Sequence, residues 1–181
     1  MGEQQPPRAR VPKRRLGLLG RDLPRPELWL PESGRETLVD FGTTFGFPDM
    51  FDRCFDVKLY CAETAFRAGG LEVLPLRLPH YRLETYGLRV TNSRRTLAYS
   101  GDSGPSERLA ELARDVDLFL CEATLLHGEL DGEPRGHLSA EEAIDAFRAS
   151  NAKRLLLTHR PSELPTPDGW PLAYDGLELD V

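Results

Sequence analysis

Apolar residues along this chain fall into short runs, and the spacing within those runs predicts the secondary structure. Runs that are continuously apolar, or that alternate with polar residues, predict strands, because successive side chains of a strand point to opposite faces. The predicted strands are 26–30, 56–60, 71–78, 86–90, 96–99, 117–121 and 153–159. We expect the tail, residues 172–181, to form a closing strand or hairpin.

Apolar residues recur at helical spacing in three other stretches. Residues 34–45 are expected to be helical, and a second helix is expected from about Ser106. Its buried face is predicted to consist of Leu109, Leu112, Ala113 and Val116. A third helix is predicted after Ser139, because Ser139 and Glu142 have the spacing of a capping box, in which each side chain satisfies a free backbone N–H of the first turn.

The stretch from Arg95 to Leu126 is the centre of the predicted fold. It contains a strand, a sharp turn, a helix and a second strand in succession, which is the pattern of an α/β unit. The turn places Asp102 between Gly101 and Gly104, at the carboxyl end of the strand 96–99. Sheets of this kind bind their ligands at the carboxyl ends of strands. Asp102 is therefore a candidate functional residue.

Composition limits the class of protein. The 181 residues are 40% hydrophobic and 29% charged, which is typical of a soluble globular domain. The net charge of −6 does not indicate nucleic-acid binding. The sequence shows neither a run of roughly 18–20 apolar residues nor a secretory signal, so we expect a cytoplasmic protein without a membrane partner. The odd number of cysteines, without a C-x-x-C pair, favours reduced thiols at Cys54, Cys61 and Cys121.

Residues 1–22 differ from the rest of the chain. They combine arginine and lysine with proline and glutamine and lack apolar periodicity, a composition typical of disorder or of a segment foreign to the fold. A basic arm for nucleic acid or another anionic surface is the alternative. We therefore expect a basic N-terminal segment at 1–22 and a folded domain at 23–181.

Polar residues stand at the ends of four predicted strands and ahead of one predicted helix. These residues are His80, Asp102, Glu122, His159 and, before the helix, His137. Imidazole and carboxylate groups suit zinc, manganese or iron. A carboxylate can also bridge two cations, and paired cations lower the pKa of a shared water. One histidine in such a position is more often a surface or core residue, but several together favour a metal site.

Several motifs around these residues occur in a fixed order. They are His80, Tyr99-Ser100-Gly101-Asp102-Ser103-Gly104, Cys121-Glu122-Ala123-Thr124, Gly136-His137-Leu138-Ser139 and Leu157-Thr158-His159. In this order they resemble the later half of the metallo-β-lactamase fold, in its ribonuclease Z-like branch. The resemblance implies an α/β fold, a partial αββα sandwich that contains mostly the second half.

The resemblance also implies a metal-dependent hydrolase and gives a role to each residue. His80 would bind the first metal, Asp102 would bridge both metals, and His159 would bind the second. Glu122 and His137 would form an acid–base pair beside them. A complete family member would hold two zinc ions, with manganese or iron as alternatives, and would cleave phosphodiester or ester bonds with a metal-bound hydroxide.

The chain departs from the family pattern upstream of His80. The family motif His-x-His-x-Asp-His has no counterpart, because the chain has no histidine before His80. Zinc prefers about four ligands, so we expect a truncated enzyme that a complementing chain or a homo-oligomer would complete. The alternative is a catalytically inactive remnant or binding module of the same fold.

Two other expectations concern the substrate and the nucleophile. Only residues 81–101 separate His80 from Asp102, which leaves no room for the inserted arm that grips tRNA in classical members of the branch. A small-molecule or generic phosphodiester substrate is therefore favoured over nucleic acid. Gly101-Asp102-Ser103-Gly104-Pro105 also resembles the nucleophile segment of trypsin-like proteases. A serine hydrolase is disfavoured, because a helix follows and Pro105 breaks the G-x-S-x-G pattern.

Overall fold

The computed structural model describes residues 24–165 and 167–180. The basic segment expected at 1–22 lies outside these residues, as does the boundary expected after it. The chain divides into two compact units, with the division between Leu59 and Tyr60. In the part of the chain that the structure describes, no helix has the length and apolar character needed to cross a membrane.

The first unit contains two helices and most of a two-stranded sheet. Its elements are β1 (Glu27–Pro31), α1 (Gly34–Thr44), α2 (Met50–Cys54) and β2 (Asp56–Tyr60), and β1 pairs with β2. The strands predicted at 26–30 and 56–60 and the helix predicted at 34–45 are therefore confirmed.

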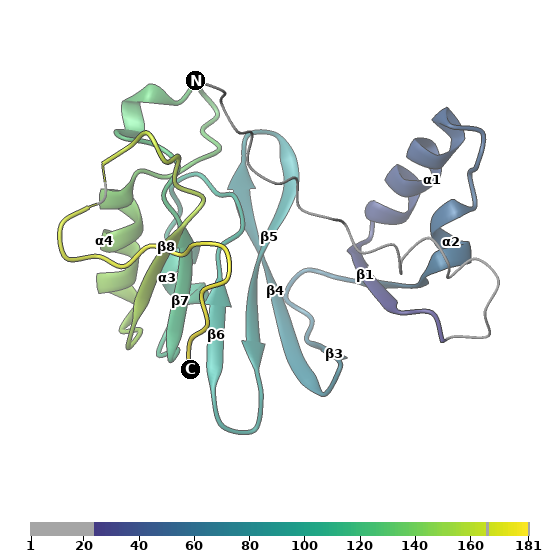
Figure 1. The fold of residues 1–181 in the computed structure, drawn as a ribbon, viewed down its shortest axis with the longest axis horizontal. Coiled ribbons are helices and arrows are strands. Elements are labelled where there is room, and N and C mark those ends of the chain that lie inside the picture. The colour runs from purple at the N-terminus through teal and green to yellow at the C-terminus, as the bar shows by residue number, and fades with distance from the viewer. Residues whose placement is uncertain (1–23, 166, 181) are drawn as a thin grey trace, which may run out of the picture. The chain divides into compact units, whose positions relative to one another are not determined.

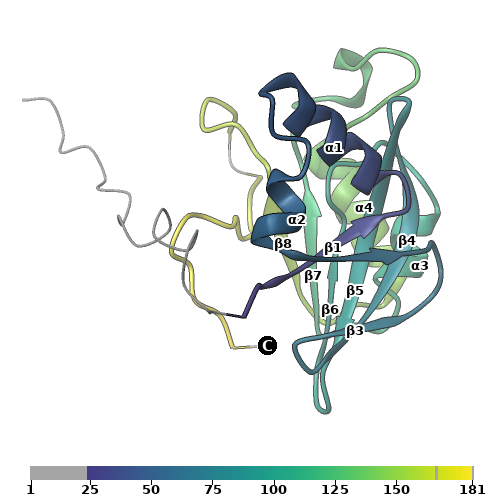
Figure 2. The same cartoon turned by 90° about the vertical axis from the view of Figure 1, so that its right-hand side faces the viewer.

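The second unit is built on one six-stranded sheet whose strands follow one another in chain order (Figure 1). The strands are β3 (Phe66–Ala68), β4 (Leu71–His80), β5 (Leu83–Thr91), β6 (Thr96–Tyr99), β7 (Leu118–Glu122) and β8 (Leu155–Thr158). Neighbours from β3 to β6 are antiparallel, whereas β6, β7 and β8 are parallel. Figure 2 shows the strands of this sheet side by side.

Helices α3 (Arg108–Leu112) and α4 (Ala140–Ser150) connect the parallel strands and share a core with the sheet. Ala98 pairs with Phe119, which pairs with Leu155, so these three side chains point to the same face of the sheet. All three are buried, together with the predicted helix face of Leu109, Leu112, Ala113 and Val116. The apolar face was therefore predicted correctly, although α3 itself ends at Leu112.

A capping box begins α4, as the sequence predicts. The backbone N–H of Glu142 donates to Oγ of Ser139 over 3.3 Å, and the N–H of Ser139 donates to Oε2 of Glu142 over 2.8 Å. Both bonds satisfy backbone donors that the first helical turn leaves without intrahelical partners. This fixes the start of α4, and with it the end of the loop that precedes the helix.

The prediction of a closing strand or hairpin at the tail is wrong. Among residues 172–180, β pairing with the sheet is limited to an isolated bridge between Leu157 and Leu172. Gly176 follows Asp175 with φ +86°, a turn conformation that interrupts any extended pairing. Strand β3 was not predicted, because three residues are too few for an alternating pattern to stand out.

All three cysteines are free thiols, as expected. Cys121 lies in the core, and burial there raises the pKa of its thiol. Cys54 and Cys61 are exposed.

Candidate metal and acid–base site

The ends of four strands meet at one edge of the second unit's sheet. Strands β6, β7 and β8 are parallel, and β4 runs in the same direction because it is antiparallel to β5, which is antiparallel to β6. Their carboxyl ends therefore lie at the same edge, where His80 ends β4 and Glu122 ends β7. Asp102 and His159 follow β6 and β8.

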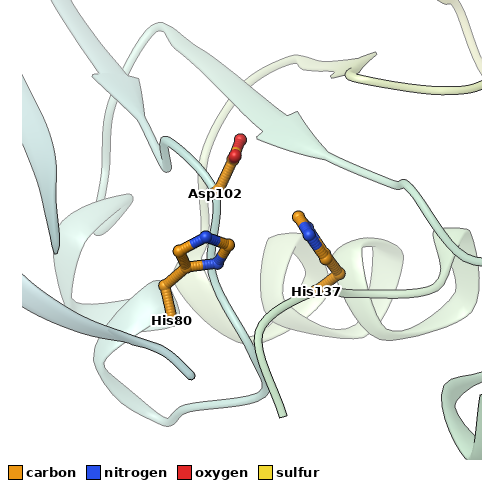
Figure 3. Close-up of side chains that lie close together, drawn as sticks. All are labelled: His80, Asp102 and His137. Carbon is orange, nitrogen blue, oxygen red and sulfur yellow. The ribbon is translucent and has the colours of Figure 1, made fainter. Parts of the chain in front are cut away.

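His80, Asp102 and His137 come together from three different segments (Figure 3). Each offers one possible ligand atom, and these atoms all lie within 4.8 Å of one another. The imidazoles of His80 and His137 are T-shaped to each other, with 4.9 Å between ring centroids. The sequence predicted that all three would reach one site, and the structure brings them together.

Glu122 is the most buried polar group of this site, with a side chain that is 1% exposed. Its Oε1 accepts from the backbone N–H of Ser103 over 2.7 Å and lies 3.0 Å from Nδ1 of His137. Its Oε2 accepts from the N–H and the hydroxyl of Thr124 and from the N–H of Leu138. Because a carboxylate only accepts, the bond to His137 requires a proton on Nδ1. That imidazole therefore presents Nε2 to the rest of the site.

His159 lies beside Asp102 at the more exposed end of the site. Its Nδ1 is 3.1 Å from Oδ1 of Asp102 and 3.0 Å from Oγ1 of Thr124. Its backbone φ of +53° is rare for a residue with a side chain. The next residue, Arg160, donates to the carbonyls of Ala123 and Leu125 and so ties this segment to the one after β7.

The donor set suits a metal ion. His159, His137 and Glu122 form a second group with ligand atoms within 4.8 Å of one another, and His137 belongs to both groups. Burial raises the pKa of the nearby Tyr99, and the carboxylates of Asp102 and Glu122 act in the same direction. Imidazole nitrogens and carboxylate oxygens are the protein ligands that bind zinc and similar divalent ions.

The structure also argues against Ser103 as a nucleophile. Its side chain is buried, its hydroxyl donates to the carbonyl of Gly104, and its N–H binds Glu122. The serine therefore helps to hold Glu122 in place.

Sequence reasoning missed three residues around the site: Tyr81, Thr124 and Asp131. Thr124 contacts both Glu122 and His159, and the ring of Tyr81 is tilted against His80 and T-shaped to His137. Asp131 binds the backbone of the loop that carries His137. For Thr124 a signal existed, because it lies two residues after Glu122, at the end of a strand. Tyr81 and Asp131 lie in turn and loop segments without periodicity.

The mixed sheet gathers imidazoles and carboxylates at the carboxyl ends of its strands, as the resemblance to the metallo-β-lactamase fold implies for an α/β protein of that class. Residues 49–160 match the beta-lactamase superfamily domain, and the chain belongs to that family. The expected α/β fold of this class is confirmed. A solved structure with zinc bound, PqqB of Methylobacterium extorquens, superimposes with a TM-score of 0.68 at 19% identity, over 86% of this chain and 64% of PqqB.

Three curated relatives show the sequence similarity. ML1173 of Mycobacterium leprae, an uncharacterised protein, is 44% identical over 108 residues, which are 59% of this chain and 37% of ML1173. YhfI of Bacillus subtilis, named a probable metallo-hydrolase, is 28% identical over 56% of this chain and 41% of YhfI. Ribonuclease Z of Archaeoglobus fulgidus is 38% identical over 36% of this chain and 22% of that enzyme. The matched part thus spans about two fifths or less of each relative.

Proposed function

We propose that this chain provides the second half of a metal-dependent hydrolase site that cleaves phosphodiester or ester bonds. The observation that carries the proposal is the convergence of three histidines, Asp102 and Glu122 at one sheet edge. Membership of the beta-lactamase superfamily supports it, as does similarity to YhfI, which is named a probable metallo-hydrolase. The similarity to ribonuclease Z supports a place in the ribonuclease Z-like branch.

His80, Asp102 and His159 are the proposed metal ligands. Zinc is the proposed metal, because two imidazoles and a carboxylate match its preferred donors and because PqqB has been solved with zinc. Asp102 has two carboxylate oxygens and lies beside both His80 and His159, so it is the proposed shared ligand. When bound, the metal supplies Lewis acidity, which polarises the substrate and activates water.

Glu122 and His137 are proposed to act together on a proton. The bond from Nδ1 of His137 to Glu122 orients the ring, so that Nε2 faces the site and can pass a proton to the leaving group. Glu122 is the orienting residue of this pair, because its two oxygens are already occupied by four other donors. The pair therefore resembles the base-and-orienter arrangement of other hydrolases.

A compact substrate is part of the proposal. Residues between His80 and Asp102 form the hairpin of β5 and β6, in which the N–H of Asn92 donates to the carbonyl of Arg95 across the turn. Because this connection is short and consists mostly of these two strands, it offers no arm that could reach along a folded RNA. A small phosphodiester or ester therefore suits the site better than nucleic acid.

Zinc content and hydrolysis test the proposal together. The purified chain is loaded with zinc, freed of excess metal and analysed for metal content, and bis(p-nitrophenyl) phosphate serves as the substrate. We expect bound zinc and slow hydrolysis, with both lost in Asp102→Ala and retained in Asp168→Asn, a substitution at an exposed aspartate. Removal of the metal with a chelator should abolish hydrolysis, and added zinc should restore it. Hydrolysis that survives in Asp102→Ala would refute the assignment.

A binding module of the same fold is the second candidate. It is favoured by the small number of ligands, since His80, Asp102 and His159 are fewer than two zinc ions prefer. In this case the chain would bind zinc weakly or not at all and would show no hydrolysis, while the Asp102→Ala variant would keep the wild-type stability.

A further inference from the structure

Asp131 is an acidic residue of the loop between β7 and α4, and both of its oxygens are engaged. Oδ2 accepts from the backbone N–H of Gly136 over 2.7 Å and from that of His137 over 3.0 Å. Oδ1 accepts from the hydroxyl of Tyr81 over 3.1 Å and from the N–H of Gly132. Burial opposes ionisation of this carboxyl, but the bonds from Gly136, His137 and Tyr81 outweigh it and lower the pKa of Asp131 to about 2.

The peptide that Asp131 holds is connected to both imidazoles of the site. His137 belongs to it directly, with its N–H on Oδ2 of Asp131 and its Nδ1 on Glu122. The carbonyl of Gly136 lies 2.8 Å from Nδ1 of His80 and accepts a hydrogen bond from the Nδ1–H of that ring. A histidine ligand commonly donates its second ring N–H to a carbonyl or carboxylate, which fixes the ring and its tautomer.

The ring of Tyr81 packs against both imidazoles and against Gly136. Its ring lies 4.8 Å from the centroid of His80 and 5.6 Å from that of His137. A Cβ added to Gly136 would come within 2.4–2.5 Å of the Tyr81 ring, so only glycine allows this close approach. The Tyr81 ring therefore packs closely against Gly136, whose backbone N–H donates a hydrogen bond to Asp131.

We infer that Asp131 is a positioning residue that sets the orientation of His80 and His137 at once. It acts through the Gly136–His137 peptide, whose N–H groups it binds and whose flanking atoms contact the two imidazoles. Asp131 touches neither ring. The functional meaning of the inference rests on the proposed function, in which His80 is a metal ligand and His137 holds a proton.

The opposite side of the loop is anchored independently, which makes the role of Asp131 specific. Arg135 donates two hydrogen bonds to Glu142, over 2.6 and 2.8 Å, and one to the carbonyl of His137. These bonds tie the loop to the first turn of α4, and we expect them to remain when Asp131 is replaced because none of them involves Asp131. Loss of Asp131 should thus release the N–H groups of Gly136 and His137 without detaching the whole loop.

Tautomers of the imidazoles test the inference without any metal or substrate. The chain has four histidines, and long-range 1H–15N spectra at pH 8 distinguish protonation at Nδ1 from protonation at Nε2 in each of them. In the metal-free wild type we expect Nδ1–H in both His80 and His137. In Asp131→Ala both should shift toward the Nε2–H form that free imidazole prefers, while the exposed His127 stays unchanged as an internal reference.

Three further variants separate positioning from general stability. Asp131→Asn keeps an oxygen for the two N–H groups and should restore the wild-type tautomers. Asp131→Ser is too short to reach them and should behave as Asp131→Ala does, which keeps the test decisive if the alanine variant fails to fold. Glu129→Gln, at an exposed acid of the same loop, is the matched control and should change nothing.

Zinc affinity and turnover give the second readout. Replacing a residue that orients a ligand costs about tenfold or more in affinity or activity, so Asp131→Ala should lower both by about tenfold with KM unchanged. Nδ1–H signals of His80 and His137 that persist in both Asp131→Ala and Asp131→Ser would overturn the inference. A wild type that neither binds zinc nor hydrolyses the diester would instead refute the proposed function. The tautomer measurement would still test the positioning role of Asp131, because it uses neither metal nor substrate.

Discussion

At the scale of single residues, the site is organised by carboxylates that accept several hydrogen bonds each. Glu122 accepts from Ser103, Thr124, Leu138 and His137, which come from three segments of the chain. Such a side chain cannot change rotamer without leaving several buried donors unsatisfied, each at a cost of about 1–3 kcal/mol. The imidazole of His137 is therefore hydrogen-bonded to a group that is itself fixed, while its backbone is held separately by Asp131.

Asp117 connects single residues to the acid stability of the fold. The bond from Lys153 and the N–H of Thr96 hold the pKa of Asp117 at about 2, below its ordinary 3.8. A carboxyl with a lowered folded-state pKa stabilises the protein above its unfolded pKa, and this contribution is lost as the pH falls through about 4 to 2. We expect the melting temperature to fall over this range, and to fall less steeply in Asp117→Asn.

The control for this prediction is Asp168→Asn, at an exposed aspartate. Melting is followed by circular dichroism between pH 7 and pH 2. Equal slopes for the wild type and Asp117→Asn would show that Asp117 does not contribute to the acid sensitivity.

The same scale shows why some site residues could be predicted and others could not. His80, Asp102, Glu122 and His159 follow apolar runs, and a strand end is visible in the sequence. The contact between Tyr81 and Asp131 spans 50 positions and joins a turn to a loop, neither of which has a periodic pattern. Long-range contacts of this kind depend on the tertiary fold, so no local sequence pattern predicts them.

At the scale of elements, the start of α4 decides where the loop carrying His137 ends. Ser139→Ala removes the hydroxyl that accepts the N–H of Glu142, and we expect a loss of about 1 kcal/mol in the free energy of unfolding. Urea titration measures this loss. Glu141→Gln, at the exposed neighbouring position, should change the stability by less than half as much. Equal losses in the two variants would rule out the cap as the cause.

The capping box and the tail show what element prediction depends on. The capping box is contained within four residues, so the sequence alone was sufficient to place it. The tail alternates apolar and polar residues as a strand does, yet Gly176 turns the chain and leaves one bridge to β8. Pairing in a sheet requires a free edge at the right place, which a local pattern cannot supply.

At the scale of the whole molecule, the irregular C-terminal segment still contributes to the core. Trp170 packs against the core and lies T-shaped to Phe147 of α4, with 5.6 Å between ring centroids. We expect Trp170→Ala to cost about 2 kcal/mol of unfolding free energy, less than for a fully buried aromatic residue. Tyr174→Ala, at a side chain that is 68% exposed, should stay within about 0.5 kcal/mol. Thermal melts compare the two, and a smaller loss in Trp170→Ala than in Tyr174→Ala would contradict the packing role.

All five candidate site residues lie in the second unit, between His80 and His159. Random mutagenesis restricted to residues 24–59 would therefore change none of them, whereas a library that covers the last residues of β4 and β7 and the segments after β6, β7 and β8 would reach all five. A selection for new substrates can thus be divided between a region that carries none of the five candidate site residues and a region that carries all of them. Recombination between family members at the boundary near residue 59 would exchange the first unit and leave the sequence of the second unit, with its site residues, unchanged.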